Sequence, residues 1–125
     1  MARLPERDKP PDDISPHAFF TSWVPQSVDA DDSRRQRLGD TQARLLFELR
    51  DAAEHERHFT LHIEAGRVRG EPGAHADPDR HVQVDVLTWR ALNRGDISAP
   101  KALLERKVTL HGNLVLALKL HLILG

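Results

Sequence analysis

Apolar and polar residues alternate in three separate stretches of the chain, and this period of two restricts the possible folds more than any other feature. The stretches are 43–49, 59–65 and 82–86, with leucine, phenylalanine, isoleucine, valine or alanine at every second position. Because successive side chains of a β-strand point to opposite faces, each stretch predicts a strand with one buried face. Three such strands in succession favour antiparallel pairing.

Two shorter segments predict additional strands. "RVRGEPG", residues 67–73, follows a glycine that ends the preceding strand, and it predicts a short edge strand. "KVTLHG" carries Val108 and Leu110 at alternate positions and predicts the last strand.

Helices are predicted before the first strand. Ser15 can cap a helix that has Pro16 at its first position, and Pro25 is expected to end it. A second, short helix is predicted over 33–38, with Gly39 as its stop.

Two more short helices are predicted after the strand at 82–86. Thr88 offers an N-cap for the first of them, and Gly95 is expected to end it. Ser98 offers the N-cap of the second, which is expected to run to Leu104.

The C-terminal segment 114–125 contains six leucines at every second position. It is too short and too interrupted by charge to cross a bilayer, which needs about 20 consecutive apolar residues. Leucine and alanine favour helix over strand, so we predict a helix. The leucines would make this helix apolar on two sides, of which one can rest on the sheet. The other side needs a second apolar partner, either a lipid or another protein chain.

The overall composition is typical of a soluble globular chain, with 30% charged and 39% apolar residues. The net charge of −1 gives no broad attraction for nucleic acid or anionic lipid, so we expect no nucleic-acid partner and only transient membrane contact. The arginines at 34, 35 and 37 lie beside aspartates and predict a solvated, self-compensating surface.

The N-terminal residues 1–13 are rich in proline and charge, which predicts a disordered tail, and residues 14–125 are expected to form a single domain. The N-terminus lacks the apolar region of a secretory signal, and the chain has no cysteine. We therefore expect a cytoplasmic protein.

Candidate chemical groups do not form a catalytic pattern in the sequence. His55, His58 and His62 resemble a zinc motif, but the last two would lie apart on the outer face of a strand. Asp85 and His111 could form an acid–base pair, yet no serine or threonine beside them has the context of a nucleophile. We expect no enzyme activity, no metal and no cofactor.

The order of these elements resembles the sterol carrier protein 2 family of small lipid-transfer domains. The resemblance rests on "RLLFELRD" and "HFTLHIEAGRVRG" as a first hairpin, and on "HVQVDVLTWRALNRGDISAPKALLERKVTLHGNLVLALKL" as the second half. It covers roughly 42–120 as a whole pattern. It implies an α+β fold: a five-stranded, mostly antiparallel sheet covered on one face by helices, with an apolar tunnel between the layers.

The function implied by this resemblance is binding of fatty acids, fatty acyl-CoAs, sterols or polyisoprenoid lipids, and their transfer without catalysis. A lipid cavity is apolar and encloses roughly 300–1,000 Å³. The expected walls are apolar residues of the sheet and of the helices: Phe47, Leu49, Leu61, Ile63, Val84, Val86, Trp89, Leu92, Leu103, Leu114 and Leu118.

An alternative function stays open at this point. The apolar C-terminal helix could dock on a partner enzyme, for example in polyprenyl-quinone biosynthesis, or on a second copy of the chain. A monomer is favoured over a dimer. A monomer with extractable lipid would support the carrier, and a lipid-free dimer would support the docking module.

Overall fold

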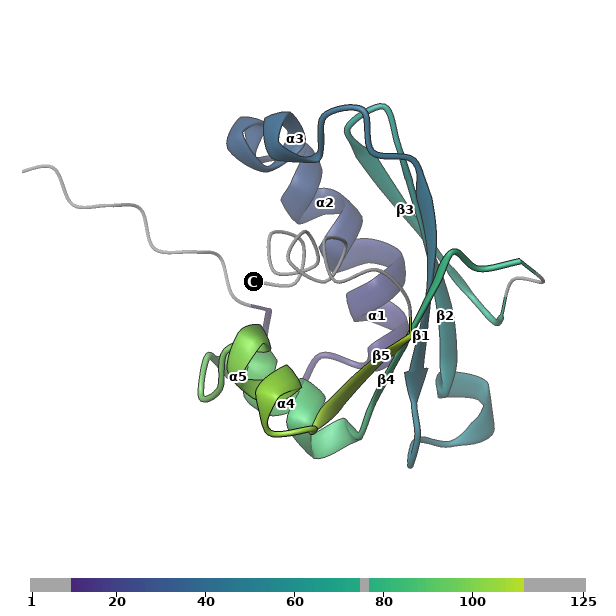
Figure 1. The fold of residues 1–125 in the computed structure, drawn as a ribbon, viewed down its shortest axis with the longest axis vertical. Helices are drawn as coiled ribbons and strands as arrows, with labels where there is room; N and C mark the ends of the chain where they lie inside the picture. Colours follow the sequence, from purple (N-terminus) through teal and green to yellow (C-terminus); the bar gives the residue numbers. More distant parts are fainter. Residues whose placement is uncertain (1–9, 75–76, 112–125) are drawn as a thin grey trace, which may run out of the picture.

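The computed structural model describes residues 10–74 and 77–111 and shows a five-stranded sheet with helices on one side (Figure 1). The strands are β1 (Ala43–Leu49), β2 (His58–Glu64), β3 (Arg67–Pro72), β4 (Arg80–Val84) and β5 (Val108–His111). Their order across the sheet is β3-β2-β1-β4-β5. The predicted α+β class is confirmed, and each strand falls in a segment that the sequence pattern indicated.

The sheet is mostly antiparallel, as expected, but it contains one parallel pair. β1, β2 and β3 form an antiparallel meander, and β5 runs antiparallel to β4. The third alternating stretch does not continue this meander, because β4 lies on the other side of β1 and runs parallel to it. β3 ends at Pro72, opposite Phe59, and the connection carries the chain back so that Arg80 lies beside Leu45.

The β3–β4 connection crosses the face of the sheet that points away from the helices. Thr60 Oγ1 donates to the Gly73 carbonyl at 2.9 Å, and the Arg44 backbone N–H donates to Asp79 Oδ2 at 2.7 Å. Thr60 and its cross-strand partner Leu46 are buried although they belong to this outer face. The outer face is therefore partly covered by the chain itself.

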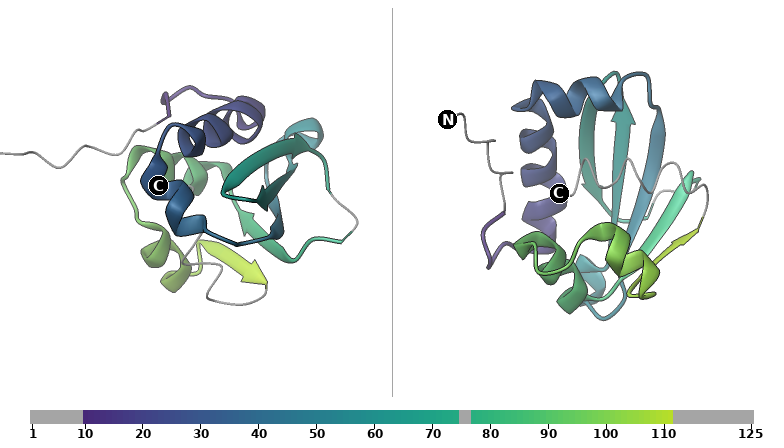
Figure 2. Two further views of the ribbon diagram at one scale, coloured as in Figure 1. Left: turned by 90° about the horizontal axis from the view of Figure 1, so that it is seen from above. Right: turned by 60° about the vertical axis from the view of Figure 1, so that its left-hand side comes forward.

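A continuous helical segment lies against the opposite, inner face (Figure 2). It consists of α1 (Pro16–Ala18), the π-helical turn η1 (Phe19–Trp23) and α2 (Val24–Asp29). Ser15 caps its start as predicted, with Oγ accepting from the Ala18 N–H at 3.1 Å.

The predicted end of this helix at Pro25 is wrong, because the helix continues to Asp29. Proline lacks an N–H and its ring crowds the carbonyl one turn back in an α-helix. The preceding turn is π-helical, with the Val24 N–H donating to the Phe19 carbonyl. Hydrogen bonds of a π turn reach one residue further back, and the wider turn accommodates the proline.

The next helix, α3 (Asp32–Leu38), agrees with the prediction. Asp31 caps its start by accepting from two backbone N–H groups, and Gly39 ends it with a φ of 52°. The expected fully solvated arginine cluster is not seen at Arg34, which is only 6% exposed and pairs with Asp31 at 3.4 Å.

Two short helices, α4 (Val86–Arg94) and α5 (Ala99–Leu104), lie at the end of the sheet where β4 finishes (Figure 1). Gly95 ends α4 in the left-handed conformation that glycine adopts without steric cost, as predicted. Ser98 caps α5, also as predicted.

The start of α4 differs from the prediction, because Asp85 rather than Thr88 is its N-cap. Asp85 Oδ1 accepts from the Thr88 backbone N–H at 2.6 Å. The side chain of Thr88 lowers the pKa of Asp85, its backbone N–H adds to this effect, and burial opposes it. The net result is a pKa of Asp85 below its ordinary value.

We expect Asp85→Ala to lower the free energy of unfolding by about 1 kcal/mol at pH 7, because the first turn of α4 loses its cap. Asp85→Asn keeps a capping oxygen and should lose less. Since the folded-state pKa is lowered, the charge contributes stability above the ordinary aspartate pKa of about 3.9, and this contribution disappears as pH falls through the folded value. Urea unfolding of the wild type and of Asp85→Asn from pH 7 to pH 2 measures this contribution of the Asp85 charge to stability. A difference between the two that stays constant over this range would contradict the assignment.

The core lies between the helical segment and the inner face of the sheet, and aromatic rings occupy its centre. The ring centroid of Phe20 lies 5.1 Å from that of Phe47 on β1 and 4.8 Å from that of Phe59 on β2. All three side chains are at most 2% exposed. Burial of each such ring contributes roughly 1.5–3 kcal/mol, so this cluster is a main source of stability.

The predicted C-terminal helix at 114–125 lies outside the described residues, as does most of the predicted tail at 1–13. At the end of that tail, Pro10 is buried and the Asp12 carbonyl accepts from Arg90 Nη1 at 2.9 Å. In the part of the chain that the structure describes, no helix has the length and apolar character needed to cross a bilayer.

Candidate functional site

An apolar cavity of about 50 Å³ lies between the inner face of the sheet and helices α4 and α5. Its walls come from η1, β1, β4, α4, α5 and β5. The lining residues are Phe20, Phe47, Val82, Val84, Trp89, Leu92, Ala99, Leu103, Val108 and Leu110. All ten of these described residues are hydrophobic, so the lining that they form suits an apolar group.

The cavity forms where the sheet extends beyond the helical segment. Val84 pairs with Val108, and Val82 pairs with Leu110, so β4 and β5 present two rows of apolar side chains to the inner side. Helices α4 and α5 cover these rows, because both connect β4 to β5. Phe20 closes the side next to the main core.

The structure brings together five of the eleven predicted wall residues. These five line the cavity: Phe47, Val84, Trp89, Leu92 and Leu103. Leu49, Leu61 and Ile63 are buried in the core instead, and Val86, at the start of α4, packs against that core. Leu114 and Leu118 lie outside the described residues.

Five lining residues were not predicted as walls: Phe20, Val82, Ala99, Val108 and Leu110. Strand alternation could have identified three of them, because Val82, Val108 and Leu110 share the inner face with Val84. Phe20 carries no such signal, since its place depends on where the helical segment crosses the sheet.

The cavity is much smaller than the 300–1,000 Å³ expected for a lipid site. In this measure one water molecule needs about 10–15 Å³, so the space corresponds to a few water molecules. An acyl or isoprenoid chain could enter only if the walls move apart. Leu92 and Leu103, on the two covering helices, are only partly buried.

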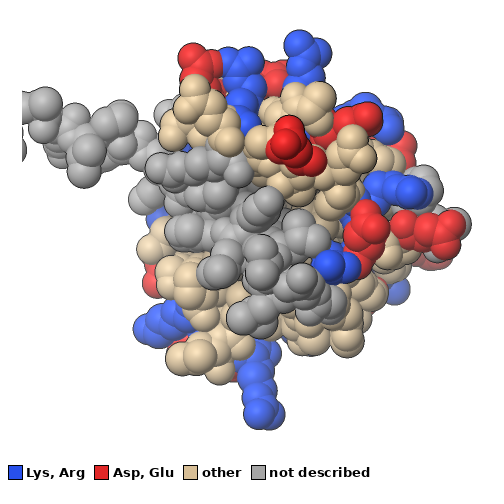
Figure 3. All heavy atoms as spheres, turned by 45° about the horizontal axis from the view of Figure 1, so that its top comes forward, with Lys and Arg blue, Asp and Glu red and all other residues tan. Residues whose placement is uncertain are grey.

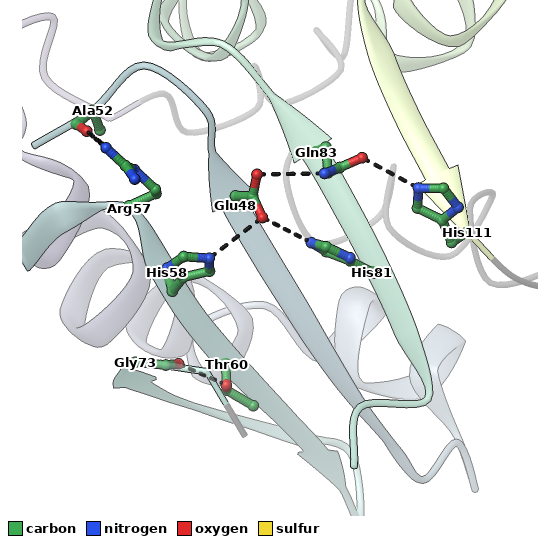
Figure 4. Close-up of polar contacts among 9 residues, drawn as sticks. All are labelled: Glu48, Ala52, Arg57, His58, Thr60, Gly73, His81, Gln83 and His111. Atoms are coloured by element: carbon green, nitrogen blue, oxygen red, sulfur yellow. Dashed lines mark hydrogen bonds and ion pairs between the residues drawn. The ribbon is translucent and has the colours of Figure 1, made fainter. Parts of the chain in front are cut away.

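A polar network lies on the outer face of the sheet, opposite the cavity (Figure 4). Glu48 Oε1 is 3.3 Å from both His58 Nε2 and His81 Nε2, and Gln83 Nε2 donates to Glu48 Oε2 at 3.3 Å. His111 Nε2 lies 3.2 Å from Gln83 Oε1 and extends the network to β5. The network therefore links β2, β1, β4 and β5.

The electrostatics of this network favour the ionised form of Glu48. Burial raises the pKa of Glu48, but the hydrogen bond from Gln83 and the nearby His81 and His58 together outweigh it. The pKa of Glu48 consequently lies below its ordinary value. Its stabilising effect is present above the ordinary glutamate pKa and is lost as pH falls through the lower folded value.

His58 and His62, which the sequence analysis considered as metal ligands, lie beside different carboxylates. His58 lies beside Glu48, whereas His62 Nε2 lies 2.7 Å from Glu71 Oε1. Within residues 10–74 and 77–111, no group of three or more histidine, aspartate or glutamate side chains is arranged to hold a metal ion. Asp85 and His111, considered from the sequence as an acid–base pair, have other partners. Asp85 caps α4, and His111 contacts Gln83.

Charged side chains of both signs are mixed on the surface. On the face drawn in Figure 3, lysine and arginine lie interspersed with aspartate and glutamate. This mixture of positive and negative side chains agrees with the net charge of −1 for the whole chain. The described part of this face presents no extended patch of one sign to a polyanion.

The fold is therefore of the α+β class: helices cover one face of a five-stranded sheet, and a cavity whose described lining is apolar lies between the two layers. Residues 24–125 match the model of the SCP-2 sterol transfer family. The chain therefore belongs to this family, as its sequence pattern indicated. Comparison with curated protein sequences finds no match.

Solved structures share this fold. A crystal structure of sterol carrier protein 2 has a TM-score of 0.64 and 15% identity, covering 85% of this chain and 95% of that one. Palmitated SCP2L2 from Aedes aegypti has a TM-score of 0.61 and 20% identity, with 82% and 87% covered. The ubiquinone synthesis protein UbiJ-SCP2 has a TM-score of 0.64 and 14% identity, with 86% and 91% covered. At these identities the similarity establishes the fold.

The same fold also occurs within a larger protein. The chain matches part of the sec-alkylsulfatase Pisa1 from Pseudomonas sp., with a TM-score of 0.63 and 16% identity. The match covers 87% of this chain but only 16% of the sulfatase.

Proposed function

We propose that this protein binds a hydrophobic lipid between the sheet and helices α4 and α5, and transfers it without catalysing a reaction. The observation that carries the proposal is that all ten described residues lining the cavity are hydrophobic, in a member of the SCP-2 sterol transfer family. The palmitated state of the Aedes aegypti relative supports a fatty acyl chain as one possible cargo class.

Loading requires the cavity to expand, because its present volume is far below that of a lipid chain. The covering helices are the parts best suited to move. α4 and α5 are short, and Gly95 lies between them in a left-handed conformation. Outward movement of α5 would separate Leu103 from the strand residues Val108 and Leu110 and lengthen the cavity toward the surface.

A substitution in the wall tests this proposal. Leu103→Gln places an amide in the apolar lining, where its burial without partners is unfavourable. We expect the affinity for a fluorescent fatty-acid probe to fall by about tenfold or more, which corresponds to roughly 1.4 kcal/mol. Fluorescence titration of the purified protein gives this value.

The neighbouring residue provides a matched control. Leu104 belongs to the same helix but is 87% exposed, so Leu104→Gln should leave the affinity for the probe unchanged. Equal effects of the two substitutions, or no effect of Leu103→Gln, would count against lipid binding in this cavity.

A second candidate function is an accessory module that docks on a partner enzyme or on a second copy of the chain. Two observations favour it: the small volume of the cavity, and the likeness to the ubiquinone synthesis protein UbiJ-SCP2. Size-exclusion chromatography at several concentrations, followed by lipid extraction, separates the two. A monomer that carries lipid supports the carrier, whereas a lipid-free dimer supports the module.

A further inference from the structure

One arginine of helix α4 connects it to a distant part of the chain. Arg90 Nη1 donates to the backbone carbonyls of Asp12 at 2.9 Å and of Ile14 at 3.0 Å. The guanidinium also lies over the ring of Trp89, 5.0 Å from the ring centroid, and Trp89 lines the cavity. Hydrogen bonds from a charged donor are stronger than those between neutral groups. Arg90 therefore joins a wall of the cavity to the N-terminal segment.

The N-terminal segment that accepts these hydrogen bonds is itself held in place (Figure 2). The Ile14 N–H donates to the Pro11 carbonyl at 3.1 Å and closes a turn that contains Asp12. The side chain of Ile14 packs against the core, and the next residue, Ser15, caps α1. The two carbonyls that Arg90 contacts are thus fixed in position.

The start of α4 is anchored as well. The Val86 N–H donates to Asp51 Oδ1 at 2.8 Å, in the connection that follows β1. The first N–H groups of a helix have no partner within the helix, so the Asp51 carboxylate satisfies one of them. Trp89 is only 3% exposed, and its ring centroid lies 5.3 Å from that of Phe19 and 6.3 Å from that of Phe20. Three separate parts of the chain therefore contact α4.

Helix α5 has a weaker attachment over the described portion of the chain. There its hydrogen bonds join only positions close in sequence, such as the Ala102 N–H to the Ser98 carbonyl and the Lys107 N–H to the Ala102 carbonyl, both at 2.9 Å. Its contacts with the rest of the domain are apolar and include Ala102, which is fully buried, and Leu103, which lines the cavity. Segments with fewer such contacts open at a lower cost in free energy.

We propose that Arg90 is a positioning residue that holds α4 against the N-terminal segment, so that α5 alone opens the cavity to a ligand. Trp89 and Leu92 then form a fixed wall, and Leu103 moves outward with α5. The inference rests on the proposed lipid binding and adds the route by which a ligand enters and leaves. Since the Arg90 contact is to the chain and not to the ligand, it slows loading and release alike and has little effect on affinity.

Removing the Arg90 contact should accelerate exchange of the ligand. Arg90→Met keeps a long apolar side chain but has no donor. We expect it to raise the loading rate of cis-parinaric acid, a fluorescent fatty acid, and its release rate into excess oleate, each by about five- to tenfold. The dissociation constant should change by less than about twofold. Stopped-flow fluorescence measures both rates.

Two further arginine variants separate the contact from a general effect of charge. Arg90→Lys keeps the charge without the planar guanidinium, so it should give rates between those of the wild type and of Arg90→Met. Arg94 lies on the same helix, is 46% exposed and pairs with Asp96 at 3.0 Å. Arg94→Met should therefore leave both rates unchanged.

Hydrogen exchange of the wild-type protein tests the same inference without a ligand. We expect the backbone amides of α5 to exchange at least about tenfold faster than those of α4. In Arg90→Met, exchange in α4 should rise toward that of α5, whereas exchange in β1 and β2 should stay as in the wild type. Mass spectrometry of peptides from each element gives these rates.

The outcomes distinguish this inference from the proposed function. Failure of cis-parinaric acid to bind the wild type would overturn lipid binding itself, and the route through α5 with it. Binding with unchanged rates in Arg90→Met, equal acceleration in Arg94→Met, or faster release without faster loading would overturn the role of Arg90 and leave lipid binding in place. The same conclusion would follow if α4 and α5 exchanged equally fast in the wild type, or if Arg90→Met raised exchange evenly over the whole sheet.

Discussion

Replacing Gly70 by alanine is expected to lower the free energy of unfolding by roughly 3 kcal/mol or more, among the largest effects of adding one methyl group. β3 passes over η1 at this position. A Cβ on Gly70 would lie 2.7 Å from the carbonyl carbon of Phe20, closer still to its oxygen, and 3.2 Å from Leu61 Cδ2. The Phe20 contacts are to backbone atoms, so no change of rotamer can relieve them.

The residue next to it supplies the control. Arg69 precedes Gly70 on β3, and its side chain is 68% exposed on the outer face, where it pairs with Glu71 at 3.4 Å. Exposed ion pairs contribute little, so Arg69→Ala should change stability by less than about 0.5 kcal/mol. Urea unfolding followed by tryptophan fluorescence measures both. A Gly70→Ala midpoint equal to that of Arg69→Ala would show that β3 and η1 are further apart than the structure places them.

The strands were predictable because their signal is local. One face of each strand is buried by the rest of the fold, and the period of two records this in the sequence at 43–49 and 59–65. Helix ends with a glycine or a capping serine were predictable for the same reason, as at Gly95 and Ser98.

Most of the predictions that were wrong concern features that depend on contacts between residues distant in the sequence. The parallel pairing of β4 with β1 results from the connection across the outer face, which no periodicity records. The helix through Pro25 depends on a π turn, and its buried face is selected by packing on the sheet. The start of α4 is a local exception: the sequence predicted Thr88 as the N-cap, but Asp85, three residues earlier, accepts the Thr88 backbone N–H.

The candidate site was predictable only in part for a related reason. Hydrophobic residues of the core and of a cavity have the same sequence pattern, so Leu61 and Ile63 could not be distinguished from Phe47. Whether a residue belongs to the core or to the cavity depends on which helices cover its strand. The segment α1–η1–α2 covers β2 and β3, whereas α4 and α5 cover the inner face of β4 and β5.

Phe20→Ala is expected to lower the free energy of unfolding by about 3–5 kcal/mol and, at the same time, to increase the stabilisation that a lipid provides. Phe20 is fully buried and packs against the rings of Phe47 and Phe59. It also forms one wall of the cavity, so removing its ring extends the cavity into the core. A ligand that binds the folded state raises the unfolding temperature by an amount that depends on its affinity, and a larger apolar space should bind an acyl chain more tightly.

Phe19→Ala separates the effect of the cavity from that of the core. Phe19 is also fully buried, belongs to the same turn, and stacks on Trp23 at 5.4 Å, but it does not line the cavity. Both variants should therefore be destabilised by similar amounts, and only Phe20→Ala should show a larger rise in melting temperature with added fatty alcohol than the wild type does. Phe20→Leu, with a smaller loss of stability, provides the same comparison if the alanine variant does not fold. Equal ligand-induced shifts in the position 19 and position 20 variants would mean that the lipid binds elsewhere, because a chain held beside Phe20 must respond to the space that its ring vacates.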